Sequence, residues 1–425
     1  MQTFSDTDKY VRKNLKRNTS LFTINGSIAS LGEGLVPLGT MLTYFIANYT
    51  ESNIFIGFMN FLAPLLSNVP QVFLARYMKK LKYNKWILIL NVLLTKSVWI
   101  IMGIVTLTVH NNLTNLIVFL LIYCIVNFGV GVQQLTWNDT VAKVVPSDVR
   151  GRFIGIRFFF VGIFEFLATL LLGLILSRFA FPNNYALVFL FSGVISIISS
   201  LLFIWIKEPP AVQPDSSISL VEYFKHLISI IHHDKTFDAI LIYDHFAILA
   251  RTISVFLIVY AKIKLSLTPF DMVLVTSVLT VTQTVFYLIW GYIDDHYGYR
   301  PSMAFSSFGF VLANLAALLF LKSIFVLIII YIFIGASQSA RNLGRINLII
   351  HLAQGKDVRT YIALNSMLLT IPFAVFPLLC GVFIDHLGYQ PFFIINIVSG
   401  CVAVLIMLFM VDEKYTSESI STSTN

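Results

Sequence analysis

Six charged side chains fall inside long apolar stretches of this sequence, where they could bind ions or protons away from bulk water. They are Glu33, Lys96, Glu165, Asp244, Arg251 and Arg341. A charge in the middle of a membrane span costs about 3 kcal/mol or more, so such a residue is a functional candidate by default. A carboxyl group there can either pair with a cation or take up a proton. The competing interpretation of each residue is a buried structural ion pair.

Two local patterns bear on the position of these charges. Pro37 follows Glu33 in the stretch LGEGLVP (31–37), and it predicts a local break in the helix that carries the glutamate. Asp244 and Arg251 are seven residues apart, so a continuous helix would place both on one face.

The composition places these charges in a membrane. The chain has 425 residues, of which 57% are hydrophobic and only 12% are charged, about half the charge of a soluble protein. Apolar runs of about 20 residues recur along the chain, and each could cross a hydrocarbon core of about 30 Å. Because these runs are continuous rather than alternating, a strand-built barrel is excluded.

The apolar runs predict an all-α polytopic membrane protein with twelve transmembrane helices. The expected spans are 21–48, 53–77, 85–108, 114–137, 153–178, 185–206, 237–261, 269–291, 301–321, 323–344, 360–384 and 391–411. A polar stretch with three prolines, 207–217, separates the first six spans from the last six. The expected domains are a cytoplasmic segment (1–20), a six-helix bundle (21–206), a cytoplasmic linker with an amphipathic helix (207–236), a second six-helix bundle (237–411) and a disordered cytoplasmic tail (412–425).

The distribution of lysine and arginine predicts the orientation. If the N-terminus is cytoplasmic, 22 of these residues lie in inner segments and four in outer loops, as the positive-inside rule requires. We therefore expect a multi-pass protein of the cell membrane with both termini in the cytoplasm. Because the net charge of +8 is spread over loop ends, it suits anionic lipid headgroups, and no nucleic acid is expected as a partner.

Two internal repeats indicate pseudo-symmetric halves. Asn138 precedes Arg150 by twelve residues, and Asn347 precedes Arg359 by the same spacing, at an offset of 209. A second repeat relates GYIDDHYGYRP (291–301) to GVFIDHLGYQP (381–391) at an offset of 90. Nested repeats of this kind are typical of transporters built from three-helix units.

With this plan, the chain resembles the major facilitator superfamily. GYIDDHYGYRP resembles the family's Gly-x-x-x-Asp-x-x-Gly-x-Arg loop, and PSDVRGRFIGIRF (146–158) resembles its loop between helices 4 and 5. The matching loop of the first half, ARYMKKLKYNK (75–85), lacks the acid. The resemblance implies a central cavity lined by helices 1, 4, 7 and 10, with helix 3 outside. Lys96 on helix 3 would then either pair with a neighbouring acid such as Glu33 or extend its ammonium group to the membrane interface. It also implies a cytoplasmic gate, for which the candidates are Asp148, Arg150, Arg152, Arg157, Gly291, Asp295, Arg300, Asp357 and Arg359.

The expected function is secondary active transport of a small solute by alternating access, coupled to protons. The candidates for the substrate and proton pathway are Glu33, Glu165, Asp244, Arg251, Arg341, Asn127, Gln134, Gln283, Gln338 and Asn365. Two alternatives stay open: a membrane-embedded enzyme, for which His245 beside Asp244 is the only hint, and a non-transporting sensor of the same fold. No enzymatic activity, cofactor or metal site is expected, and the chain is expected to be a monomer. The sequence contains no nucleotide-binding loop and no hydrolase or metalloprotease motif.

Overall fold

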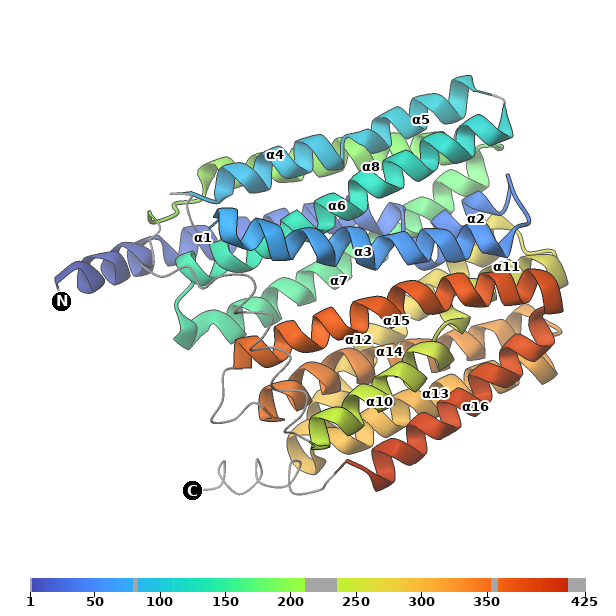
Figure 1. Ribbon diagram of the computed structural model, residues 1–425. Coiled ribbons are helices and arrows are strands. Elements are labelled where there is room, and N and C mark those ends of the chain that lie inside the picture. The colour runs from blue at the N-terminus through green and yellow to red at the C-terminus, as the bar shows by residue number, and fades with distance from the viewer. Residues whose placement is uncertain (1, 79–82, 110, 211–234, 353–357, 412–425) are drawn as a thin grey trace. The chain divides into compact units, whose positions relative to one another are not determined.

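The computed structural model describes residues 2–78, 83–109, 111–210, 235–352 and 358–411 (Figure 1). Within these ranges every regular element is a helix. The amphipathic helix expected around 221–232 and the tail expected at 412–425 lie outside the described residues.

The helices form two compact units. One unit contains residues 1–49 and 62–217, and the other contains 50–61 and 218–425. The division falls within α3 (Asn53–Met78), so that the first turns of this helix belong to the second unit.

The first unit holds the elements of the N-terminal half. In chain order they are α1 (Gln2–Leu35), the π-helical turn η1 (Leu38–Leu42), α2 (Thr43–Ile46), most of α3, α4 (Lys85–Thr95), α5 (Val98–Thr108), α6 (Asn112–Val144), α7 (Ser147–Arg178), α8 (Asn183–Leu201) and the 3-10 turn η2 (Leu202–Trp205). Within this unit α1 packs against α7 and α8, and α4 and α5 pack against α6 and α8 (Figure 1).

The second unit holds the elements of the C-terminal half. They are α10 (Lys235–Ala250), α11 (Ile253–Leu265), α12 (Pro269–Tyr297), α13 (Tyr299–Phe320), α14 (Ile324–Leu352), α15 (Val358–Leu387) and α16 (Tyr389–Phe409). Here α13 packs against α14 and α16, and α10 packs against α16 (Figure 1). Joining the pieces of interrupted helices gives twelve helical segments in the described chain.

Eleven stretches of the described chain are long and apolar enough to cross a membrane. The first helix, α1, is not among them, because polar residues such as Asn25 and Glu33 lower its hydropathy. It begins at Gln2 rather than near residue 21, so the polar N-terminal stretch forms the first turns of the same helix.

Three membrane helices are interrupted, and a charged residue lies at or beside each interruption. Pro37 is extended and follows the end of α1 at Leu35, because proline disfavours a helical conformation in the residue before it. Lys96 lies between α4 and α5, and Arg251 lies between α10 and α11. Irregular backbone is tolerated within a bilayer only where protein covers it or where it lines a cavity. The three interruptions therefore indicate positions in the protein interior rather than at the lipid-facing surface.

The repeated segments 291–301 and 381–391 each form a tight corner between two helices, with a glycine at the corner. Gly298 has φ 77° and joins α12 to α13, and Gly388 has φ 84° and joins α15 to α16. Each glycine donates its N–H to a carbonyl four residues earlier, Gly298 to Asp294 at 3.1 Å and Gly388 to Ile384 at 2.8 Å. Only glycine adopts this backbone conformation without strain.

Aromatic packing fixes the ends of the first unit's helices. Phe22 of α1 is fully buried, and its ring meets Trp137, Phe153 and Phe203 edge-on at centroid distances of 5.6 to 6.3 Å. Such pairs contribute about 0.5–1.5 kcal/mol each beyond their buried area. The cluster ties α1 to α6, α7 and η2 next to the cavity described below.

Candidate functional site

The first unit contains a partly open cavity of about 510 Å³. Its walls come from α1, η1, α5, α6, α7 and α8 and from the breaks after α1 and α4. Its charged residues are Glu33, Lys96 and Arg157, and its amides include Asn127 and Gln134. The volume lies within the range of small-molecule sites. This cavity is therefore the first part of the candidate site.

An ion pair between two interrupted helices crosses this cavity. Nζ of Lys96 lies 3.1 Å from Oε1 of Glu33. The lysine side chain is 9% exposed and the glutamate side chain 52% exposed. Water in the cavity therefore reaches the carboxylate but hardly reaches the ammonium group.

Helix α7 brings two more charged residues to the pair. Arg157 and Glu165 both interact electrostatically with Glu33. The guanidinium of Arg157 lies 4.8 Å from the ring centroid of Trp137, and its buried Nε has no hydrogen-bond partner among the described residues. The sequence suggested Arg157 as a gate residue, and the structure places it in the cavity wall.

Two glycines allow α1 to approach α7 closely enough for these contacts. A Cβ atom at Gly26 would lie 2.8 Å from Nε of Arg157, and one at Gly34 would lie 2.8 Å from Cβ of Ala168. Larger side chains at these positions would separate the helices that carry Glu33, Arg157 and Glu165.

The two predicted amides of α6 line the same cavity. Nδ2 of Asn127 donates to the carbonyl of Tyr123 at 2.8 Å, and Oε1 of Gln134 accepts from Gln71 of α3 at 3.4 Å. Both amides line the cavity, where they could hydrogen-bond a polar solute.

The second unit contains a separate buried charge cluster. Asp244 of α10 is fully buried, with its Oδ1 2.6 Å from Nη2 of Arg341 and its Oδ2 3.5 Å from Nε of Arg345. Both arginines lie on α14, one helical turn apart. The side-chain amide of Asn365 lies against Arg345, and in the amide orientation that satisfies both groups its oxygen accepts from Nε and Nη2 of Arg345 at 3.2 and 2.7 Å.

Arg251 lies close to this cluster but has a different partner. Its guanidinium lies 5.1 Å from the ring centroid of Phe373 in α15, and the guanidinium of Arg341 lies 5.8 Å from the same centroid. The two predicted site arginines of the second unit thus both lie within cation–π distance of one ring.

The predicted glutamines of the second unit form a short hydrogen-bond chain. Gln338 of α14 donates to the hydroxyl of Ser254 at 3.2 Å and accepts from the amide of Gln283 in α12. Ser254 lies three residues after Arg251, so the chain ends next to the interruption between α10 and α11. Polar hydrogen-bonding groups therefore extend from α12 to the break that carries Arg251.

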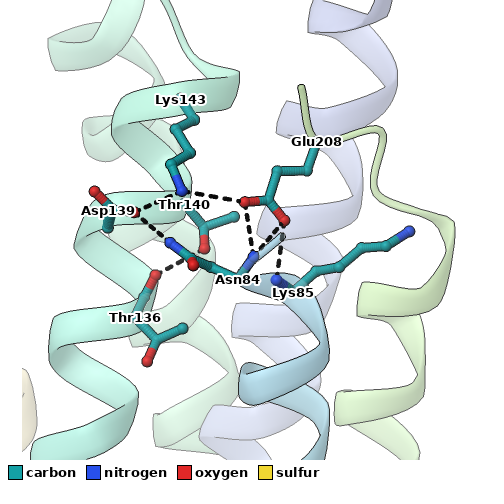
Figure 2. Close-up of polar contacts among 7 residues, drawn as sticks. All are labelled: Asn84, Lys85, Thr136, Asp139, Thr140, Lys143 and Glu208. Carbon is teal, nitrogen blue, oxygen red and sulfur yellow. Dashed lines mark hydrogen bonds and ion pairs between the residues drawn. The ribbon is translucent and has the colours of Figure 1, made fainter. Parts of the chain in front are cut away.

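A third polar group holds helix ends of the first unit together (Figure 2). The buried carboxylate of Glu208 accepts from the backbone N–H groups of Asn84 and Lys85 at 2.9 and 3.0 Å, which caps the start of α4. Lys143 bridges Glu208 at 3.5 Å and Asp139 at 2.8 Å. The Asn84 amide also donates to Asp139. This group was not anticipated from the sequence, where Glu208 is marked only by its place between a lysine and two prolines.

The predicted gate residues are described only in part. The side chains of Asp148, Arg150, Arg152, Asp295 and Arg359, and all of Asp357, lie outside what the structure describes. Arg300 donates from Nε to the carbonyl of Met407 at 3.2 Å and from Nη2 to that of Leu408, so it covers the end of α16. Gly291 lies on α12 with only Leu343 near its Cβ position.

Sequence reasoning anticipated one residue of these charge clusters and missed another. Lys96 was expected on an outer helix with a neighbouring acid such as Glu33 as one possible partner, and it pairs with Glu33. Arg345 was overlooked as a site residue, although its spacing of four from Arg341 puts both on one helix face. No group of three His, Cys, Asp or Glu side chains in the described ranges could hold a metal ion.

The helices and buried charge clusters define a polytopic helical membrane protein with a polar interior. The sequence matches the family profile of the Major Facilitator Superfamily over residues 22–250 and 245–424, and the chain belongs to this superfamily of transporters. No curated protein matches the sequence.

Solved structures of this superfamily share the fold. A mutant of the nucleoside transporter NupG has a TM-score of 0.74 at 13% identity, covering 93% of this chain and 100% of that one. A POT family transporter in complex with 5-aminolevulinic acid has a TM-score of 0.70 at 13% identity, covering 95% and 96%. The xylose transporter XylE from E. coli has a TM-score of 0.63 at 15% identity, covering 95% and 98%.

Proposed function

We propose that this protein is a secondary active transporter that moves a small solute by alternating access, driven by a proton gradient. The observation that carries the proposal is the ion pair of Glu33 and Lys96 in the wall of a solute-sized cavity. A protein of this superfamily with a half-exposed carboxylate at that position has a proton acceptor next to the space that a solute would occupy.

Protonation of Glu33 is the step that links the proton to the solute. When the carboxylate is charged, it holds Lys96, and the two residues tie the break after α1 to the break between α4 and α5. When it is protonated, the ion pair loses its Coulomb attraction, and the two interrupted helices are free to change their relative position. Arg157 and Glu165 face the same carboxylate from α7, so the four groups together are close to neutral.

A solved relative supports the coupling. One similar structure is that of a D-xylose-proton symporter, with a TM-score of 0.66 at 16% identity, covering 93% of this chain and 97% of that one. Proton coupling is therefore compatible with this fold, and in this chain Glu33 is the residue we assign to it.

The remaining sequence predictions complete the proposal. The protein is a monomer of the cell membrane with cytoplasmic termini, two six-helix bundles (21–206 and 237–411) and a linker (207–236). The charged segments 148–157 and 357–359 form the cytoplasmic gate. Replacing Arg150 by alanine should then lower the transport rate more than the substrate affinity, because it alters the exchange between states.

The decisive experiment measures transport by purified protein in proteoliposomes. A screen of labelled solutes with an imposed pH gradient identifies one that accumulates, and counterflow at equal pH measures exchange. Glu33→Gln mimics the protonated state, so it should abolish uphill accumulation and spare counterflow. Glu51→Gln, which removes an exposed acid, should leave both unchanged.

Three results would contradict the proposal. Folded Glu33→Gln protein that still accumulates solute with wild-type pH dependence would remove Glu33 from the coupling step. Solute that is chemically converted rather than moved would indicate an enzyme. Solute that binds without counterflow would indicate a sensor.

A further inference from the structure

The buried charges of the second unit do not balance. Three guanidinium groups, those of Arg251, Arg341 and Arg345, gather in the interior of this unit, and Asp244 is the one carboxylate that pairs with any of them among the described residues. The cluster therefore carries an excess of two positive charges. The charged groups that interact around Glu33 in the first unit, in contrast, balance, with Glu33 and Glu165 as acids and Lys96 and Arg157 as cations.

The excess positive charge lies mainly on Arg251 and on the Nη1 side of the Arg341 guanidinium. The side chain of Arg341 is 2% exposed, and although Nη2 bonds to Asp244, its Nη1 has no partner within the described part of the chain. Arg251 is half-buried, and the structure places it against the face of Phe373 rather than against a carboxylate. Within the described ranges, Nη1 of Arg341 therefore lacks an acceptor, and the ion pairs of this unit do not include Arg251.

A cation–π contact does not replace a counter-ion in this position. The face of a phenylalanine ring attracts a cation, but the ring has no lone pairs to accept hydrogen bonds from a guanidinium. A buried charge without a paired charge is among the least favourable arrangements in a protein. Three arginines around one aspartate would be compensated if an anion occupied the site during part of the transport cycle.

We propose that Arg251 and Arg341 bind an oxyanion with two negative charges, a dicarboxylate or a phosphate group, as the charged part of the transported solute. The planar guanidinium matches the geometry of carboxylate and phosphate oxygens and binds them with two parallel hydrogen bonds. Arg251 lies at the break between α10 and α11, outside both helices. Ser254 lies three residues further along the chain and accepts a hydrogen bond from Gln338, so neutral polar groups lie near this break. This inference names the solute class and rests on the proposed transport function.

Binding can be measured without transport. Detergent-purified protein is heated with sodium succinate, with sodium hydrogen phosphate, with uncharged succinamide, or with sodium chloride at equal ionic strength. Succinate or phosphate should raise the Tm by about 2–4 °C, and succinamide and chloride should not. The two anions distinguish a carboxylate ligand from a phosphate ligand.

The variant Arg251→Gln separates a binding role from a structural one. Because it removes an uncompensated charge, it should fold, keep or raise the Tm without ligand, and lose the shift caused by the anion. Arg251→Lys keeps the charge without the planar fork and should recover part of the shift. Lys264→Gln removes an exposed cation from α11 and should leave the shift unchanged.

Several outcomes would overturn the proposal. The first is that neither anion raises the Tm of the wild-type protein. The second is that the anion raises the Tm of Arg251→Gln as much as that of the wild type. The third is that Arg251→Gln fails to fold, which would show that the guanidinium is a structural element. Uptake of an uncharged solute that survives Arg251→Gln would exclude the anion class and leave the transporter proposal intact. Anion binding without counterflow of any solute would exclude transport and leave the anion site intact.

Discussion

Glu33 and Lys96 form an ion pair of 3.1 Å next to interruptions in two different membrane helices. Glu33 lies in the last turn of α1, which ends at Leu35, and Lys96 follows the last residue of α4. The pair therefore links the end of α1 to the break between α4 and α5. Its removal should affect conformational exchange more than folding.

Replacing Lys96 by methionine tests this link. The side chain is 9% exposed, so methionine fills the same space without leaving a buried charge. We expect Lys96→Met to fold with a free energy of unfolding within about 1 kcal/mol of wild type, because the partly exposed pair is screened by water. Transport should fall at least tenfold. The double variant Glu33→Gln/Lys96→Met should be no less stable than either single variant, and additive destabilisation in thermal unfolding would contradict the pairing.

Gly34 sets the distance between α1 and α7. In Gly34→Ala the new Cβ would lie 2.8 Å from Cβ of Ala168 and 3.2 Å from the carbonyl oxygen of Glu165. Overpacking of this kind costs about 1–3 kcal/mol, which should appear as a lower Tm. Gly155→Ala on α7 is the matched control, because nothing lies within 4 Å of its Cβ position. Equal Tm values for the two variants would show that the helices do not need this close contact.

Glu208 should be important for the stability of the first unit. Its buried carboxylate accepts from two N–H groups at the start of α4 and pairs with Lys143. Glu208→Gln keeps the shape but removes the charge, and we expect a loss of about 2–3 kcal/mol. Asp139→Asn, which changes a half-exposed partner of the same lysine, should cost less than about 1 kcal/mol. The comparison is made by thermal unfolding, and the reverse order would place the main support at Asp139.

Asp385 caps the start of α3 within the second unit. Its carboxylate accepts from the N–H groups of Asn53 and Ile54, both at 3.0 Å, and from Nδ2 of Asn53 at 2.7 Å. Loss of such a cap costs about 1 kcal/mol, so Asp385→Ala should lower the Tm and increase hydrogen exchange in the first turn of α3. His386→Ala changes an exposed neighbour and should do neither. Unchanged exchange at residues 53–56 in Asp385→Ala would show that the cap is dispensable.

The sequence predicted the fold well because apolar length alone determines where membrane helices lie. It also predicted the break at Pro37, since proline is a visible signal. The breaks at Lys96 and Arg251 have neither proline nor glycine beside them, so nothing in the local sequence marks them. This had a direct consequence for Asp244 and Arg251, whose spacing of seven suggested a shared helix face. The helix is interrupted at Arg251, and Asp244 pairs with Arg341 instead.

The corners at Gly298 and Gly388 have a consequence for how the protein is made. Each joins two long apolar helices through one residue, which is too short for one helix to enter the bilayer while the other waits outside. We therefore expect the pairs α12–α13 and α15–α16 to enter the bilayer as hairpins, and the second unit to assemble from helix pairs rather than from single helices.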